Sequence, residues 1–344
     1  MEFNISAKMV GQKNRLNNMQ LSVIIVHYKT PQLLLDCVTS LWEFSDGVNL
    51  EVVVVDNDSK DESEKLIWNA FPQTKWIQSG YNAGFARANN LGIRNSTGEY
   101  ILLLNPDTFI KVGFLDKMLA NYKELSNKEN LGLLGCRIIS SVDGSLLVGT
   151  GRGFQGLSKY LKANPLVIKF FPKYVDKKKY NAEKMHYKNH EVDFVSGACV
   201  MMKREKIENH KLYLDEDFFL YYEDVEWSFR VKKEGFINYF LAATEVYHVN
   251  SASTDANPMK NKVILASEFL YLYKTMSYFQ FWLLKRLVFV NIQLNTFFLK
   301  RRKLEDLLSQ EKEYSSQVTS ILARIENNYL RKTSSAKSYL KYAE

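Results

Sequence analysis

The sequence predicts an α/β domain of the doubly wound type, with a mostly parallel central sheet. Two apolar, β-branched runs, at residues 21–28 (LSVIIVHY) and 50–57 (LEVVVVDN), are typical of strands that are covered on both faces. The segment between them, 31–44, has the apolar spacing of a helix and completes a β-α-β unit. Strand-like and helix-like segments continue to alternate along the chain, which is the pattern of doubly wound sheets.

The later segments alternate in the same way. Their expected bounds are helix 61–71, strand 75–78, helix 85–96, strand 99–105, strand 132–139 and strand 192–203. Residues 169–188 are rich in Lys and Tyr and have no clear period, so we expect them to form a mobile loop.

The character of the chain changes close to Pro258, and we expect three regions. Residues 1–20 carry charges and lack the continuous apolar stretch of a secretory signal, which predicts a flexible extension. Residues 21–258 form the α/β domain, and residues 259–344 a helical, basic and aromatic region. From Leu304 onward the apolar spacing predicts an amphipathic helix with a gap near Glu311, which either folds back or pairs with a copy of itself as a homo-oligomer.

Charge and cysteine content exclude several classes of protein. The chain has a net charge of +8, and residues 259–344 hold 15 Lys and Arg against 7 Asp and Glu, so this region carries the whole excess. A neutral α/β domain is not typical of a nucleic-acid-binding body, so we expect no nucleic-acid partner. The three cysteines are widely spaced, which argues against a disulfide framework or a zinc site and favours a reducing compartment.

Three acids follow strand-like runs: Asp56 after VVVV, Asp107 after ILLLNP, and Asp224 in the stretch FFLYYEDVEW. Open α/β sheets bind ligands at the carboxyl ends of their strands. A single acid in this position often only caps the following helix. Three of them, together with a histidine after a late apolar strand, His248, favour a functional site.

Common nucleotide-binding motifs do not account for these acids. Residues 151–156 match GxGxxG, but no long apolar strand precedes them, and the first β-α turn, HYKTPQ, has no glycine. The stretch DNDSKDES lacks the glycine of an EF-hand, and the chain has no P-loop motif. A diphosphate can instead be bound through Mg²⁺ or Mn²⁺, held by one or two carboxylates and the substrate phosphates. Asp107 is suited to that role, because Pro106 fixes the turn that presents it.

The chain resembles inverting glycosyltransferases of family 2, which have the GT-A fold, in the bacterial branch that contains many rhamnosyltransferases. The matching segments are SVIIVHY, VVVVDNDSKD, GYNAGFARANNLGI, LLLNPDT, SGACVMMKRE, FFLYYEDVEWSFR and VYHVNSAS, in family order across residues 21–254. The resemblance implies a GT-A catalytic domain at 21–258 and sugar transfer from a UDP- or dTDP-sugar.

The resemblance also implies roles for individual residues. Asp56 would accept the imide N–H of uracil or thymine, and Asn105 and Asp107 occupy the DxD site, where the first Asp is replaced by Asn. That replacement makes metal binding weaker or more dependent on the diphosphate. Asp107 and His248 would be the ligands of the Mg²⁺ or Mn²⁺ ion. The expected nucleotide-sugar contacts are Tyr28, Asp56, Asn82, Arg87, Asn90, Asn105, Gly197 and Ala198.

The EDVEW stretch is expected to carry the reaction. Inverting transfer needs a base that takes the proton of the acceptor hydroxyl, and Asp224 matches that position in the family, with Glu223 beside it. Since neighbours in sequence need not point the same way, we expect only one of them to face the acceptor. The alternative is a surface helix start in which Arg230 is an ion-pair partner.

The C-terminal region suggests where the protein works. Residues 278–299 are long enough to span a bilayer, but Lys285, Arg286 and three amides oppose insertion. A basic, aromatic segment of this kind is typical of an anionic membrane surface; the alternative is a helix packed on the catalytic domain. We therefore expect transfer to a lipid-linked oligosaccharide or polysaccharide at the cytoplasmic face of the membrane, with L-rhamnose from dTDP-rhamnose as the first candidate. A different UDP-sugar, or a non-catalytic glycan-binding partner, are the alternatives.

Overall fold

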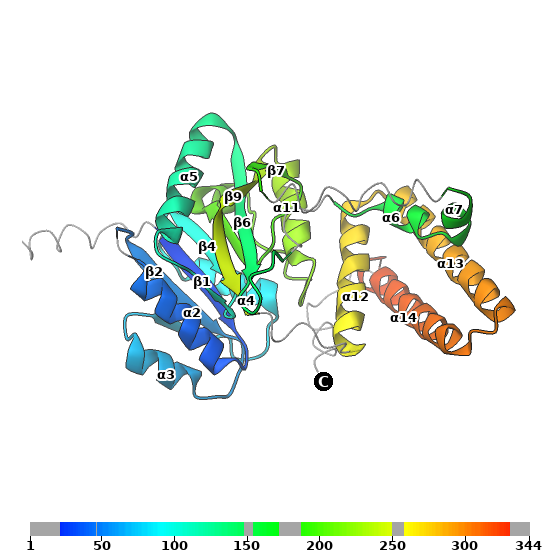
Figure 1. The fold of residues 1–344 in the computed structure, drawn as a ribbon, viewed down its shortest axis with the longest axis horizontal. Helices are drawn as coiled ribbons and strands as arrows, with labels where there is room; N and C mark the ends of the chain where they lie inside the picture. The colour runs from blue at the N-terminus through cyan, green and yellow to red at the C-terminus, as the bar shows by residue number, and fades with distance from the viewer. Residues whose placement is uncertain (1–20, 46, 148–153, 172–186, 250–257, 331–344) are drawn as a thin grey trace, which may run out of the picture.

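The strands of the protein form one mixed sheet. The computed structural model describes residues 21–45, 47–147, 154–171, 187–249 and 258–330. Within these ranges the sheet has nine strands in the order β3-β2-β1-β4-β8-β6-β9-β5, and β7 also pairs with β9 (Figure 1). The strands are β1 Leu21–His27, β2 Leu50–Asp56, β3 Lys75–Gln78, β4 Tyr100–Leu104, β5 Thr108–Phe109, β6 Leu131–Ser140, β7 His190–Val192, β8 Cys199–Lys203 and β9 Ile237–His248.

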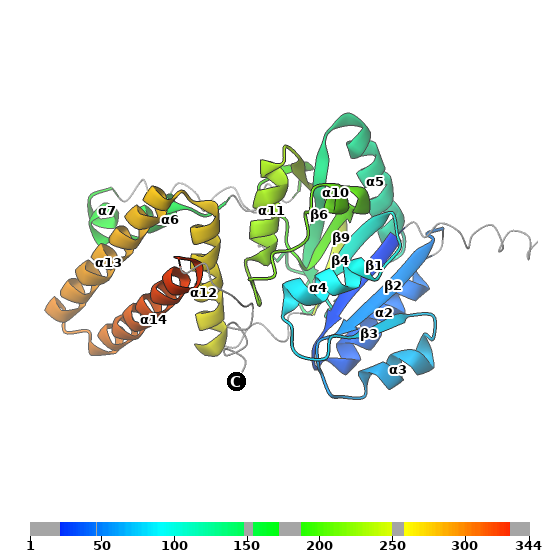
Figure 2. The same cartoon turned by 180° about the vertical axis from the view of Figure 1, so that it is seen from behind.

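Helices cover both faces of this sheet, and a group of helices stands beside it (Figures 1 and 2). Helices α2, α3 and α5 lie on one face, and α4, α10 and α11 on the other. The helix bounds are α2 Pro31–Glu43, α3 Ser63–Ala70, α4 Phe85–Arg94, α5 Phe114–Lys128, α6 Leu157–Lys162, α7 Pro165–Phe170, α10 Arg204–Asn209, α11 Glu223–Lys233, α12 Pro258–Thr275, α13 Tyr278–Arg301 and α14 Glu305–Leu330.

The two faces explain why the first strands are apolar throughout. Along β1, Leu21, Val23 and Ile25 belong to the core under α2 and α5, whereas Ile24 and Val26 belong to the core under α4 and α11. Successive side chains of a strand point to opposite faces, so a strand covered twice needs apolar residues at both parities. β1 pairs in parallel with β2 and β4, and β2 with β3. The predicted β-α-β unit and the mostly parallel central sheet are confirmed, with antiparallel strands added beyond β4.

The strand predicted at 192–203 is wrong in its first half. Val192 ends β7, and β8 begins only at Cys199, on different neighbours in the sheet. In the intervening loop, side chains of α11 accept the backbone N–H groups: Val195 N donates to Ser228 Oγ at 3.2 Å, and Gly197 N donates to Asp224 Oδ2 at 2.9 Å. These tertiary hydrogen bonds replace the ladder that a strand would need.

Some predictions fall on segments that the structure does not describe. The expected flexible extension at 1–20 lies outside the described residues, as do residues 151–153 of the GxGxxG match. Of the loop expected at 169–188, residues 172–186 lie outside the described part. The described residues ahead of residue 172 include the short helices α6 and α7, which pack against α13.

Helices α12, α13 and α14 enclose a core of their own, the three-helix unit. Its buried residues include Phe269 and Leu272 of α12, Leu284 and Val288 of α13, and Ile321 of α14. The amphipathic helix predicted from Leu304 is confirmed as α14, which runs without a break through the expected gap near Glu311 and folds back onto α12 and α13. Among the described helices, none combines the length and the apolar content that crossing a membrane requires.

Candidate active site

The carboxyl ends of β1, β2 and β4 meet at one edge of the sheet. His27, the last residue of β1, pairs with Asp56, the last residue of β2, and Ile24 of β1 pairs with Leu103 of β4. In the order β3-β2-β1-β4, strands β2 and β3 are added on one side of β1, and β4 is added on the other side. Ligands of open α/β sheets bind outside this switch point. Asp56 and the turn that contains Asp107 therefore lie where the sheet favours a ligand.

Asp56 and Asn82 are joined through a residue that the sequence analysis did not name, Asn57. Asn57 Nδ2 donates to Asn82 Oδ1 at 2.8 Å, and Ala83 N donates to Asn57 Oδ1 at 2.8 Å. Asp56 is buried, and its Oδ1 accepts a hydrogen bond from Ser59 N at 3.1 Å. Tyr28 follows β1 directly and is exposed. The loop after β2 and the loop before α4 are thus held against each other.

Gly197 lies between α4 and the acids of α11. A Cβ atom placed on Gly197 would lie 3.4 Å from both Phe85 Cε1 and Asp224 Cβ, so Gly197 is packed closely against both residues. Gly197 N donates to Asp224 Oδ2 at 2.9 Å. One residue further on, Ala198 O accepts a hydrogen bond from Asn105 N at 3.0 Å. A continuous series of contacts therefore joins Asp224 to the turn that carries Asp107, and both acids face the same edge of the sheet.

Asp107 and His248 lie side by side. β5 pairs with β9 in antiparallel register, with Thr108 opposite His248, and Val249 N donates to Asp107 O at 2.7 Å. As a result, His248 Nε2 is 3.2 Å from Asp107 Oδ1. The structure brings together the two side chains that the resemblance implied as metal ligands.

The donor groups around Asp107 and His248 fit a divalent cation whose remaining ligands come from a bound phosphate and water. Within the described part of the chain, Asn105 Oδ1 and His248 Nδ1 are buried without a hydrogen-bond partner, which is costly unless a further group binds there. Among the described residues no cluster of three or more His, Cys, Asp or Glu side chains is found. Two protein ligands suit Mg²⁺ or Mn²⁺, which keep waters and take phosphate oxygens as additional ligands.

The two acids at the start of α11 differ in environment. The Glu223 carboxyl is buried, and its Oε2 finds no partner among the residues that the structure describes. Burial, followed by the neighbouring Asp224 charge, raises its pKa well above the ordinary value. Burial also raises the pKa of Asp224, to about 6, although the N–H groups of Gly197 and Val225 favour the charged form. Asp224 is only partly buried. Burial and the neighbouring charge thus favour the uncharged form of Glu223, and Asp224 is the less buried of the two residues.

The segment 213–222, here called the hinge loop, leads into these acids and is bound by α4. Asn90 is fully buried. Its Nδ2 donates to Leu214 O at 2.9 Å, and its Oδ1 accepts from Leu214 N at 3.0 Å. Arg87 Nε donates to Glu216 O at 3.1 Å. Two residues that the resemblance placed near the nucleotide are thus bonded to the hinge loop in this structure.

The three-helix unit binds the hinge loop from the other side. Lys274 Nζ of α12 lies 2.6 Å from Asp215 Oδ2 and 2.5 Å from Asp217 Oδ2. Tyr329 of α14 donates to Asp217 Oδ2 at 2.7 Å, and Phe218 is buried in the core of the unit. The loop ends with Tyr221 and Tyr222 at φ values of 68° and 66°, a left-handed conformation that costs about 1–3 kcal/mol per residue. Contacts on both sides maintain this strain just before Glu223.

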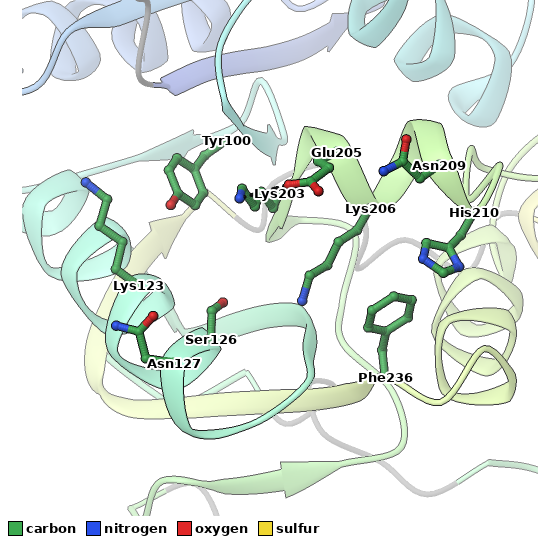
Figure 3. Close-up of a pocket in the computed structure, with 10 residues that line it drawn as sticks. All are labelled: Tyr100, Lys123, Ser126, Asn127, Lys203, Glu205, Lys206, Asn209, His210 and Phe236. Carbon is green, nitrogen blue, oxygen red and sulfur yellow. Dashed lines mark ion pairs between the residues drawn. The ribbon is translucent and has the colours of Figure 1, made fainter.

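A separate cavity of about 540 Å³ lies at the opposite edge of the sheet. Its lining includes Tyr100, the first residue of β4, whereas Asp107 follows the end of that strand. Figure 3 shows Lys206 and Ser126 pointing into this space. None of the predicted site residues lines it.

The family of the chain follows from its sequence. Residues 22–211, more than half of the chain, match the profile of glycosyl transferase family 2. The chain belongs to glycosyl transferase family 2. The family resemblance read from the motifs is confirmed.

Two curated relatives cover a similar part of the chain. The low-salt glycan biosynthesis hexosyltransferase Agl10 of Haloferax volcanii is 28% identical over 228 residues, 62% of this chain and 62% of that protein. The N-acetylglucosaminyl-diphospho-decaprenol L-rhamnosyltransferase of Mycobacterium tuberculosis is 25% identical over 220 residues, 61% of this chain and 69% of that protein. The chain thus spans less than two thirds of the length of the first relative.

A solved structure shows the same architecture. The crystal structure of GalNAc-T7 with UDP, GalNAc and Mn²⁺ has a TM-score of 0.50 and 15% sequence identity, covering 73% of this chain and 48% of that chain. At this identity the likeness concerns the fold alone. Together with the family, it identifies the α/β domain of this family 2 chain as a GT-A fold, as predicted.

Proposed function

We propose that this family 2 protein is an inverting glycosyltransferase that moves one sugar from a UDP- or dTDP-sugar to an acceptor hydroxyl. The observation that carries the proposal is the arrangement of the acids. The Asp107–His248 pair and the partly buried Asp224 lie at the same edge of the sheet, joined through Asn105, Ala198 and Gly197.

Asp224 is the proposed base. The acceptor oxygen forms a bond to the anomeric carbon while the bond from that carbon to the diphosphate breaks, and the acceptor proton passes to an Asp224 oxygen. A carboxyl group with a pKa of about 6 is ionised at neutral pH and still accepts a proton readily. The raised pKa of Glu223 favours its uncharged form, so Asp224 is the proposed charged member of the pair.

The diphosphate end of the donor is assigned to the Asp107 side. Asp107 and His248 would hold Mg²⁺ or Mn²⁺, which stabilises the negative charge of the leaving nucleoside diphosphate. Asp56, buried at the end of β2, is the proposed partner of the base, and Gly197 and Ala198 leave room for the sugar. Asn82 accepts a hydrogen bond from Asn57, the residue after Asp56, and is thereby held close to Asp56.

The names of the relatives support the substrate class. One relative is a hexosyltransferase of glycan biosynthesis, and the other is an L-rhamnosyltransferase whose name gives a diphospho-decaprenol acceptor. We propose a lipid-linked or polysaccharide acceptor of cell-surface glycan synthesis, at the cytoplasmic face of the membrane, with dTDP-L-rhamnose as the first donor to test. A turnover assay with a panel of UDP- and dTDP-sugars tests the proposal, and donor binding without turnover of any member would contradict it.

Metal binding is expected to depend on the nucleotide. Because two side chains alone hold an ion weakly, Mn²⁺ should raise the melting temperature only slightly by itself and by several degrees when UDP or dTDP is present. His248→Ala should remove this cooperative increase. His210→Ala, on the exposed side of the distant cavity, is the matched control. Equal Mn²⁺ stabilisation with and without nucleotide would show that the phosphates do not complete the site.

A further inference from the structure

A cavity of about 770 Å³ lies between α7, α13 and α14, among residues that the proposed reaction does not use. These three helices stand away from the sheet (Figure 1). The apolar lining of the cavity comes from Ile168, Phe298, Leu299 and Leu307. The volume falls within the range of about 300–1,000 Å³ that is typical of small-molecule sites. We refer to it as the distal cavity.

The distal cavity continues along α13. A second cavity of about 450 Å³ is lined in part by Asn295, Glu311 and Tyr314, which also line the distal cavity. The second cavity reaches Val288 and Ile292 on α13 and Leu265 on α12. Because they share these three residues, the two cavities adjoin along α13, and we refer to the pair of spaces as the channel. An elongated pair of this kind suits a flexible chain better than a compact, polar molecule.

Positive charge gathers beside this channel. Lys169 and Arg302 line the distal cavity and remain exposed, and Lys300, Arg301 and Lys303 surround Arg302 in the sequence. Acidic groups are present but fewer. Glu311 lines the cavity and accepts from Asn295 Nδ2 at 3.3 Å, and Glu305 and Asp306 occupy the first turn of α14. Helix α13 itself has no acidic residue.

Exposed apolar side chains lie on the segments around the channel. Phe170 and Phe171, at the end of α7, are both 64% exposed, and Phe297 of α13 is 56% exposed. Leu304 and Leu307, near the start of α14, are also exposed. Soluble proteins rarely expose a contiguous apolar surface that has no partner, and a rim of cations and aromatic side chains is typical of helices at an anionic bilayer.

We propose that the distal cavity binds one acyl chain of an anionic phospholipid of the bilayer, with its phosphate held by Lys169 and Arg302. The phenylalanines around it would enter the headgroup layer. A lipid supplies both the apolar chain and the negative charge, whereas a second copy of this chain would bring the same cations face to face. The proposal rests on the proposed function only in that a lipid-linked acceptor is found at the same membrane.

Charge reversal tests the phosphate contact in the full chain. The double variant Lys169→Glu and Arg302→Glu should bind vesicles of phosphatidylglycerol and phosphatidylcholine at least about tenfold more weakly by co-sedimentation, because each cation near an anionic surface contributes to binding. Lys312→Glu, an exposed lysine of α14 that lines neither cavity, should change binding much less. If both variants lost vesicle binding equally, net charge alone would explain the binding, and the proposal would be overturned.

Filling the cavity tests the chain contact. Leu307→Trp leaves the net charge of the protein unchanged and should lower the uptake of pyrene-labelled phosphatidylglycerol. The melting temperature of the variant shows whether it is folded. Undiminished uptake by the folded variant would overturn the proposal. If that variant does not fold, Leu299→Phe provides the same test with a smaller increase in volume.

Two further arms separate this proposal from its rivals. Binding to phosphatidylcholine vesicles that contain a prenyl phosphate, without binding to phosphatidylglycerol, would assign the cavity to the lipid carrier of the acceptor and overturn the assignment to a bilayer lipid. UDP and dTDP binding is measured in parallel. Intact vesicle binding by a chain that transfers no sugar would contradict the proposed function alone.

Discussion

Replacing Asp224 by Asn is expected to lower the rate of sugar transfer by about 10²–10⁴-fold, the usual contribution of general acid–base catalysis. An amide has the shape of the carboxylate but cannot take the acceptor proton. The donor site is formed largely by other residues, so binding of UDP or dTDP should change by less than about threefold, below the effect of one typical hydrogen bond. The loss should appear in kcat rather than in KM for the donor.

Glu223→Gln is the matched control for this variant. Glu223 is the sequence neighbour of Asp224, but its carboxyl is buried, and burial raises its pKa well above the ordinary value and favours the uncharged form. An uncharged amide should therefore replace it with little loss of turnover. Initial rates with a labelled sugar donor measure both variants. If Glu223→Gln abolished transfer and Asp224→Asn did not, the two assignments would be reversed.

The pH dependence follows from the same group. Transfer requires the ionised form of Asp224, whose pKa is about 6, so kcat/KM should fall about tenfold per pH unit below that value. The effect on stability has the opposite sign. Because burial raises the pKa values of Asp224 and Glu223 in the folded state, the folded state binds more protons than the unfolded one, and stability falls as pH rises from about 4 to 6. Melting temperatures of Asp224→Asn should show a smaller decrease over this window.

Lys274→Met is expected to lower kcat by roughly 10²-fold although Lys274 is a positioning residue that does not touch the substrate. The substitution leaves Asp215 and Asp217 without their shared cation and releases the hinge loop from α12. The strained backbone at Tyr221 and Tyr222 then relaxes, and Asp224 moves with it. We expect a loss of stability of about 1–3 kcal/mol, as for other broken, partly buried networks.

The kinetic readout separates positioning from general instability. In Lys274→Met, kcat should fall while KM for the donor stays nearly constant, since Asp56 and Asp107 lie on other loops. Lys274→Arg should restore most of the rate because it retains the charge. Lys262→Met, an exposed lysine on the same helix, should have no effect. A parallel loss of donor affinity and kcat in Lys274→Met would indicate that the whole site had collapsed.

Several parts of the fold and site could be predicted because their signals are local. The runs before Asp56 and Asp107 are apolar at every position, and only strands covered on both faces need that pattern. The predicted strand at 192–203 failed for the opposite reason. Gly197 and Val195 donate their N–H groups to side chains of α11, which lie about 30 residues further along the chain. Asn57 and Lys274 were missed because nothing in their surroundings in the sequence marks them.

The sequence by itself determined the family, the order of the elements and the residue types that follow the strands. Each depends on a chemical identity or on a period of side chains along a few neighbouring positions. Only the tertiary structure decided that Asp107 meets His248, and that Asp224 is less buried than Glu223. Burial and electrostatic environment depend on which distant segments pack around a group, and this burial raises the pKa values of both Glu223 and Asp224 above their ordinary range.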